Sequence, residues 1–497
     1  MCQFVGSDAI PLNRIALISK VREDGTTKDR IVWDLRRSKV NELIRQNQRI
    51  VLPRLADAVR DALELLSQCE PGEEVEFGVV DVSDAFHTIP LHRSEQRYQC
   101  TFFEGKFQLY LVLVFGSSSA PTLWGRMAAF IGRSTQCLSS DRRLRIQIYV
   151  DDPLFAVRGT ARVRQLEVTI SLLWIVALGF PLAWSKATFS FDVQWIGANL
   201  KVSALSVSVV IPEKKIIEAL TLIERIRSRA VVSRSVLQSF VGKMSFLAGL
   251  VIYLKPFIAP MWAVLAKPGI RPNDADPTPQ TQGSRKLPEH MVHVKRFTTS
   301  LNWLEAFLKG QVGSLQRTYT PKPDRTEFVQ FAVDASPWGI GGVCFDASGN
   351  PLEWYADTIR PSDAQFLNAS VGVCDFNTLW ESLAILVGLR LWGKQCLGAC
   401  IQIRSDSLAA INSLVKLASA NPGLNRIACE LSLDLADLTY EVELFEHIPG
   451  ISNVIADALS RLQAPEASEI PEMLLRTPRR ECPLRDHSFW KTSSRKN

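Results

Sequence analysis

The sequence lacks several features that would place it in common classes of protein. No apolar run approaches the roughly 20 residues that a membrane-spanning helix needs, and no basic segment followed by an apolar one marks a signal peptide at the N-terminus. The ten cysteines have no metal-ligand spacing, since Cys396 and Cys400 lack an accompanying His or Cys pair. We therefore expect reduced thiols, no membrane partner, and a location in the cytoplasm or the nucleus.

The sequence also has little excess charge of either sign. Its 57 Lys and Arg residues face 51 Asp and Glu residues, a net charge of +6, which permits a polyanionic partner without requiring one. With 497 residues, of which 46% are hydrophobic, the chain is too long for a single core. These values predict a globular protein of two or more domains.

Acidic residues follow short apolar strands in the first half of the chain. The stretch 147–155 has two apolar runs around Asp151 and Asp152, which predicts a β-hairpin with the acids at its turn. Another apolar strand, 77–80, leads directly into Asp81. The Asp pair alone is equally compatible with a solvated turn. Three carboxylates together, however, suit two Mg²⁺ ions, which take few carboxylates and complete their coordination with water and phosphate oxygens.

The two segments that carry these acids, and a third segment between them, resemble three successive polymerase motifs of reverse transcriptases. The segments are 81–86, 113–121 and 149–152. Their order and spacing are similar to those of retroviral enzymes and of long-terminal-repeat (gypsy-like) or DIRS-like retrotransposon enzymes. The resemblance implies an RNA-directed DNA polymerase with an α+β right-hand fold of fingers, palm and thumb. It also implies that Asp81, Asp151 and Asp152 hold two Mg²⁺ or Mn²⁺ ions, and that the partners are an RNA template, a DNA primer and dNTPs.

The same resemblance assigns residues to the incoming dNTP. Arg30, in a basic hairpin of the fingers, would contact the triphosphate, with Lys28 as a weaker candidate; the alternative is a solvated strand face. Phe86 would block a ribose 2′-hydroxyl or, alternatively, pack in the core. Gly116 would let the backbone approach the template–nucleotide pair. Lys186 would protonate the leaving pyrophosphate, or is a plain surface lysine.

Two residues depart from the retroviral pattern. Phe115 stands where retroviral enzymes typically carry Gln, and retrotransposon relatives also use Phe there. Pro153 directly follows the acid pair and removes a donor from the strand ladder, which we expect the first outgoing position of a hairpin to tolerate.

A second series of acids lies in the last third of the chain, in the order strand, helix, strand, helix. Its members are Asp334, Glu381, Asp406 and Asp457. The series resembles the ribonuclease H fold and its four-carboxylate, two-metal centre, with His447 and Asn453 at the family's offsets from Asp457. The resemblance implies an α/β ribonuclease H-like domain that cleaves the RNA strand of an RNA–DNA hybrid. All four acids would hold two Mg²⁺ or Mn²⁺ ions, and His447 would assist proton transfer or product release.

These patterns divide the chain into five expected segments: fingers and palm (1–210), thumb-like helices (211–266), a linker or connection (267–323), the ribonuclease H-like domain (324–462) and a basic, disordered tail (463–497). Within the thumb-like segment, Ser235 and Gln238 have the spacing of a capping box, which predicts a helix starting after Ser235.

Two functions remain at this point. The chain is either a bifunctional retrotransposon enzyme or a catalytically dead, transposon-derived remnant that at most binds nucleic acid. Retention of all seven acids favours the enzyme. The short segment before the basic hairpin leaves open that the chain is a fragment of a larger polyprotein.

Overall fold

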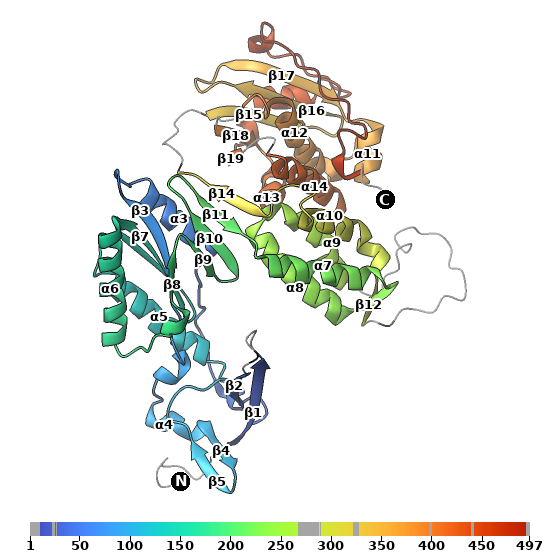
Figure 1. Ribbon diagram of the computed structural model, residues 1–497. Helices are drawn as coiled ribbons and strands as arrows, with labels where there is room; N and C mark the ends of the chain where they lie inside the picture. Colours follow the sequence, from blue (N-terminus) through green and yellow to red (C-terminus); the bar gives the residue numbers. More distant parts are fainter. Residues whose placement is uncertain are drawn as a thin grey trace. The chain divides into compact units, whose positions relative to one another are not determined.

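The computed structural model describes residues 10–21, 25, 27–266, 288, 290–321, 328–396, 400–438 and 442–493, without the side chains of Lys28, Phe328 and Glu443 (Figure 1). The chain divides into two compact units, 1–210 with 318–321, and 211–317 with 322–497. None of the helices in this described part is both long and apolar enough to cross a membrane.

A four-stranded antiparallel sheet forms the centre of the first unit. Its order is β6 (Leu144–Tyr149), β7 (Asp152–Gly159), β3 (Glu74–Val79) and β8 (Thr188–Ser190). Helices α5 (Ala120–Gln136) and α6 (Ala161–Ala177) cover one face, where Trp124 and Ile175 pack with Phe155. Helix α3 (Leu55–Leu66) packs on β7 as well. Successive side chains of a strand face opposite ways, so the unbroken apolar run in β7 reflects burial on both faces.

The basic hairpin expected near the N-terminus is present. Strands β1 (Leu12–Val21) and β2 (Thr27–Asp34) pair antiparallel, and β4 (Cys100–Phe103) and β5 (Lys106–Leu109) extend the same sheet beyond β1. Trp33 is buried with Leu35, Val40 and Val114 in a small core of its own. Helix α2 (Val40–Leu43) follows β2.

A third sheet completes the first unit. It contains β9 (Asp192–Trp195), β10 (Ala198–Val202) and β11 (Val207–Val210), with β14 (Gln316–Tyr319) beside β11. The interval 267–323, expected to be a linker, therefore contains this strand. It also contains β13 (Met291–His293) and α10 (Thr298–Leu308); residues 267–287 lie outside the described part.

The second unit begins with helices. They are α7 (Glu213–Arg227), α8 (Arg234–Leu250), α9 (Lys255–Ala266) and α10, with the short strand β12 (Val231–Ser233) paired to β13. The expected capping box is wrong: Ser233 is the N-cap of α8, and its Oγ accepts a hydrogen bond from the N–H of Val236 at 3.3 Å. Ser233 has an extended backbone, whereas Ser235 already lies in the first helical turn.

A five-stranded mixed sheet forms the rest of the second unit. Its order is β17 (Pro351–Thr358), β16 (Gly339–Phe345), β15 (Phe328–Ala335), β18 (Cys400–Ser405) and β19 (Val442–His447). The first three strands are antiparallel, and β15, β18 and β19 are parallel. Adjacent glycines of β16 face opposite sides: a Cβ on Gly341 would overlap Leu459, and one on Gly342 would overlap Tyr355 and approach Val333.

Helices cover both faces of this sheet. They are α11 (Pro361–Leu367), α12 (Asn377–Trp392), α13 (Leu408–Lys416), α14 (Pro422–Ala436) and α15 (Val454–Ser460). Helix α12 is apolar and buried almost all round because the sheet lies on one side of it and α13 and α14 on another. Helix α15 packs on β15 and β16.

The expectation that residues 463–497 form a disordered tail is wrong for the described residues 463–493. Phe489 and Trp490 are buried in the core of the second unit. The side chain of Arg485 is fully buried, where its Nε and Nη1 contact the carboxylates of Asp363 and Asp357, each at 2.7 Å. A basic composition suggested solvation, but two large aromatic rings and two partner acids bury this segment instead.

Candidate active sites

The hairpin expected around the first acid pair is present, and its turn is strained. Tyr149 lies opposite Asp152, so Val150 and Asp151 form a two-residue loop between β6 and β7. Val150 has φ of 56°, while Asp151 is not among the residues with positive φ. A positive φ at the first loop position is usual for Gly, and a β-branched residue there costs about 1–3 kcal/mol. The indole N–H of Trp124 holds this turn by donating to the Val150 carbonyl at 2.6 Å.

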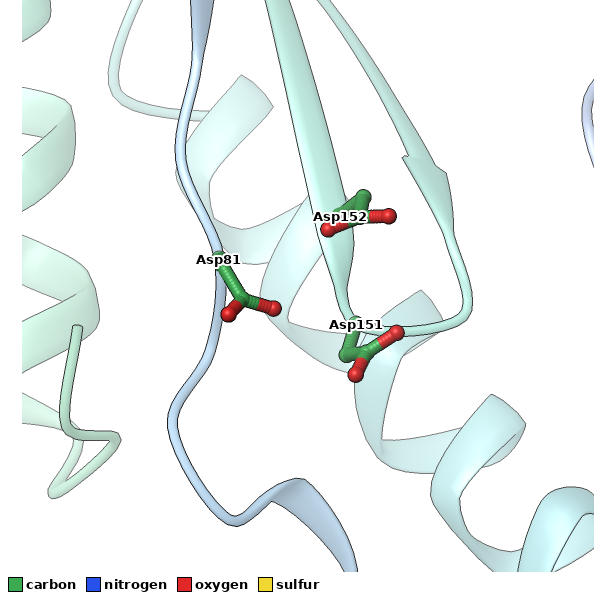
Figure 2. A group of neighbouring side chains, drawn as sticks. All are labelled: Asp81, Asp151 and Asp152. Carbon is green, nitrogen blue, oxygen red and sulfur yellow. The ribbon is translucent and has the colours of Figure 1, made fainter. Parts of the chain in front are cut away.

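The chain that follows β3 places Asp81 beside this turn. The N–H of Val82 donates to the Asp151 carbonyl at 2.9 Å, and the N–H of Val80 donates to the Pro153 carbonyl at 3.2 Å. These bonds continue the β3–β7 ladder past its last paired residues. Asp81 lies between the two donors and therefore faces the hairpin tip, as Figure 2 shows.

Pro153 lies in a central strand, where proline is unusual. Its carbonyl accepts the bond from Val80, and the N–H and C=O of one strand residue point to the same neighbour. The N–H that proline lacks would therefore have faced Val80, beyond the end of β3. The cost is one ladder bond at the edge of the ladder, and the hairpin keeps its register.

The three carboxylates of Asp81, Asp151 and Asp152 meet within 4.8 Å of one another. Burial, and then the charge of Asp151, raise the pKa of Asp152 to about 6. Lys186 Nζ forms an ion pair with Asp81, whereas neither Asp151 nor Asp152 has an ion-pair partner in the described part of the chain. The cluster therefore holds more negative charge than its neighbours neutralise, and its hard oxygen donors fit Mg²⁺ or Mn²⁺.

Two of the predicted nucleotide-binding residues contact one aromatic ring, that of Phe115, and a third follows it in the chain. The guanidinium carbon of Arg30 lies 5.4 Å from the ring centroid, and the Phe86 ring lies 5.2 Å from it. Gly116 has φ of 112°, and a Cβ there would overlap the carbonyl oxygen of Trp33. The side chain of Lys28 lies outside the described residues. Lys186 is instead at Asp81, in the carboxylate cluster.

A second cluster lies at one edge of the mixed sheet. Oxygens of Asp334 on β15, Glu381 on α12 and Asp406 after β18 lie within 4.8 Å of one another. Because β15 and β18 are parallel neighbours, their carboxyl ends meet at the same edge, and α12 brings Glu381 to it.

Two of the three acids in this second cluster are buried, and their charge is poorly neutralised. Asp334 is 3% exposed and Glu381 is 6% exposed. Burial is the main cause that raises the pKa of Asp334 to about 7, and the charges of Asp406 and Asp457 raise it further. Burial, followed by the charge of Asp334, holds the pKa of Glu381 well above its usual range. Glu381 Oε2 is buried and accepts no hydrogen bond among the described residues, which fits a site for a cation.

Asp457 is beside this cluster but not within it. Its Oδ1 is 2.7 Å from Nε of Arg461, one helical turn later, and its side chain is 43% exposed. Three of the four predicted carboxylates therefore lie together here, and the fourth pairs with Arg461. Helix α15 still reaches the cluster through Ser460, whose Oγ donates to Asp334 Oδ2 at 2.7 Å.

His447 and Asn453 anchor the last motif to the strand ends. His447 is exposed, and its Nε2 lies 3.0 Å from the carbonyl oxygen of Asp406. A carbonyl only accepts, so Nε2 carries the proton in this contact. Asn453 is buried and donates from Nδ2 to the carbonyl of Val333 at 3.1 Å. The imidazole therefore stands next to the carboxylate cluster without being one of its ligands.

Several residues that shape the two sites were not predicted from the sequence. Trp124 and Trp195 donate indole N–H groups to the carbonyls of Val150 and Asp152, the latter at 3.0 Å. Ser460 and Arg461 orient Asp334 and Asp457. A buried indole needs an acceptor, which is a weak indication available from the sequence, but nothing in the sequence specifies which carbonyl it meets.

Comparisons with known proteins agree with part of this description. Residues 29–208 match the family model described as "Reverse transcriptase (RNA-dependent DNA polymerase)", an interval that contains the whole first cluster. The comparison with curated proteins found no match.

Among solved structures, the chain is similar to three structures of the foamy viral protease-reverse transcriptase. The complex of its dRH form with double-stranded DNA has a TM-score of 0.45 and 15% identity, covering 88% of this chain and 66% of that one. The complex with an RNA/DNA hybrid has a TM-score of 0.42 and 14% identity, covering 95% of this chain and 53% of that one. A further complex with double-stranded DNA has a TM-score of 0.44 and 15% identity, covering 88% of this chain and 78% of that one. The chain thus spans just under two thirds of the length of the first of these solved chains and about half of the length of the second.

Proposed function

We propose that the reverse transcriptase domain of residues 29–208 copies RNA into DNA, adding dNTPs to a DNA primer on an RNA template. The observation that carries the proposal is the meeting of three carboxylates within 4.8 Å at a strained hairpin tip, inside the interval matched by the family. A strained turn held by an indole hydrogen bond is a cost that a merely structural hairpin would not need.

In this function Asp81, Asp151 and Asp152 would hold two Mg²⁺ or Mn²⁺ ions. When bound, such ions neutralise phosphate charge and favour ionisation of the attacking primer hydroxyl. The raised pKa of Asp152 reflects carboxylates crowded together without enough positive charge, which is the condition that a divalent cation relieves. Lys186 neutralises Asp81 in the structure, and to donate a proton to pyrophosphate it would first have to leave that carboxylate.

The nucleotide would lie against the Phe115 cluster. Arg30 is exposed and has no carboxylate partner among the described residues, so its planar fork is available for a triphosphate. Phe86 is half-buried against the Phe115 ring and would contact the sugar. Gly116 keeps the loop tight against β2, and its backbone would approach the template–nucleotide pair. Lys28 remains a weaker candidate for the phosphates.

We further propose that residues 324–462 are a ribonuclease H-like domain that cleaves the RNA strand of the hybrid product. The triad of Asp334, Glu381 and Asp406, two of them buried and one, Glu381, with an orphaned oxygen, supports it. Asp457 would complete the metal-binding set on leaving Arg461, and His447 would move a proton or assist release of the product.

We assign the enzyme to a retrotransposon, because Phe115 stands before Gly116 where retroviral enzymes typically carry Gln. The gypsy-like and DIRS-like classes both remain compatible with this residue. The assignment adds no residue to either site.

The test is a pair of assays on the purified full chain. We expect extension of an oligo-dT primer on poly-rA with Mg²⁺ or Mn²⁺, and cleavage of a labelled RNA strand annealed to DNA, both stopped by EDTA. A dead remnant would bind the primer–template in a gel-shift assay and give neither product with either metal. That outcome would overturn the proposed function.

A further inference from the structure

The loop before α5 is fixed to the second strand of the basic hairpin. The N–H of Trp33 in β2 donates to the Phe115 carbonyl at 2.8 Å. The next residue, Gly116, approaches the Trp33 carbonyl so closely that no Cβ would fit. The Phe115 side chain therefore has a defined place relative to β2, the strand that carries Arg30.

The Phe115 ring contacts residues from two separate segments. From β2, the Arg30 guanidinium lies over the ring at 5.4 Å, a distance at which a cation is attracted to an aromatic face. From the 3₁₀ helix at Ala85–Thr88, the rings of Phe86 and His87 approach to 5.2 and 5.5 Å, tilted by 52° and 77°. Such tilted pairs are the preferred aromatic geometry.

Few polar contacts of these side chains compete with the ring. His87 Nε2 is buried and has no hydrogen-bond partner among the described residues. Arg30 has no carboxylate partner in that part of the chain. The contacts with the Phe115 ring are thus a main constraint on the distance between the Arg30 guanidinium and the Phe86 ring.

We propose that Phe115 is a positioning residue that sets the distance between the triphosphate contact, Arg30, and the sugar contact, Phe86. One nucleotide must touch both groups, so their separation determines how tightly a dNTP binds and how strictly a ribose is refused. The inference rests on the proposed function and adds to it a residue that determines sugar selectivity. Gln, the residue typical of retroviral enzymes, has no ring and could make neither the cation–π contact with Arg30 nor the ring contact with Phe86.

The test compares Phe115→Leu with Phe115→Tyr. Leu keeps an apolar side chain but removes the ring, whereas Tyr keeps the ring. Phe107→Leu is a matched control in the same unit: Phe107 is exposed, pairs with Phe102 at 4.9 Å, and has no described ring or cation contact with Arg30 or Phe86. Circular dichroism and thermal melting would show that each variant folds.

Steady-state single-nucleotide extension gives the first measurement. We expect Phe115→Leu to raise KM for the dNTP about tenfold and to lower the preference for dNTP over rNTP by a similar factor, as loss of a cation–π contact and ring pairs implies. The value of kcat should change little, because the carboxylates are untouched. Phe115→Tyr and Phe107→Leu should resemble the unmodified chain.

A second measurement needs no chemistry. A primer ended by a dideoxynucleotide is bound to template and protein with Mg²⁺, and the dNTP concentration that protects this complex from a competitor is determined. Protection at an unchanged concentration in Phe115→Leu, or an unchanged sugar preference, would overturn the inference while the proposed function stands. An unmodified chain that neither extends a primer nor forms the protected complex would overturn both.

Discussion

The two carboxylate clusters bring three acids equally close together by different means. The first lies at a hairpin tip, partly exposed, and depends on a strained Val150 and on indole N–H groups from distant segments. The second lies where two parallel strands end, and two of its three acids, Asp334 and Glu381, are buried. In the first cluster the free-energy cost of bringing the acids together includes backbone strain, whereas in the second it comes mainly from removing carboxyl groups from water.

If the clusters serve separate reactions, removing one ligand should disable one reaction only. We expect Asp151→Asn to lower primer extension by at least about a thousandfold, because a metal ligand in the reacting cluster is lost. Hybrid cleavage should remain within about twofold of the unmodified chain. Asp406→Asn should show the reverse pattern. Primer extension and hybrid cleavage measured on the same preparations check both, and a joint loss in either variant would break the comparison.

The position of Asp457 offers a finer test of the second cluster. If Asp457 joins the metal site, Asp457→Asn should reduce hybrid cleavage by about 10- to 100-fold, with primer extension unchanged. Arg461→Gln removes the side chain that draws Asp457 aside, and should reduce cleavage far less. Equal losses in the two variants would mean that the ion pair itself, and not the free carboxylate, is what the domain needs.

The strained turn at the first cluster predicts that changing a residue outside the carboxylates also lowers primer extension, though less than losing a metal ligand does. Trp124→Phe keeps most of the buried ring but removes the donor to the Val150 carbonyl. We expect primer extension to fall about tenfold through a lost hydrogen bond at a strained turn, with cleavage intact. Trp392→Phe, which removes an indole donor to Glu353 in the second unit, is the matched control. Rates that differ little between the two variants would argue against a role for the turn.

Desolvation at the second cluster predicts the smallest effect, and one of opposite sign. Glu381→Gln replaces a buried carboxylate that lacks a partner on Oε2. In EDTA at neutral pH we expect the variant to be more stable by about 1–3 kcal/mol, because burial raises the pKa of the Glu381 carboxyl in the folded chain and an amide has no such ionisation to lose. Denaturant unfolding checks this. The corresponding change at the more exposed Asp151 should alter stability by less, and a destabilised Glu381→Gln would contradict the expected cost.

Patterns local in sequence predicted much of this molecule. The hairpin around Asp151, the strand before Asp81, the basic hairpin and the strands that end in Asp334 and Asp406 all follow from apolar runs interrupted by acids. Each depends on neighbours a few residues away, where periodicity is informative.

What was missed depends on contacts between distant segments. Nothing in the sequence around Val150 indicates a left-handed residue, because the cost is offset by Trp124, 26 residues earlier. The C-terminal segment was expected to be solvated because its composition is basic. The acids that pair with its Arg485 lie more than 100 residues upstream, at Asp357 and Asp363.

The burial of Arg485 determines where a shorter version of the second unit can end. A fragment stopped at residue 462, where the catalytic motifs finish, would keep Asp363 in the interior with no side-chain counter-charge from Arg485, and would uncover the apolar surface beneath Phe489 and Trp490. Such a fragment is expected to aggregate or melt early. Laboratories that express the domain alone should therefore carry the chain through residue 493, even though no proposed catalytic group lies in its last thirty residues.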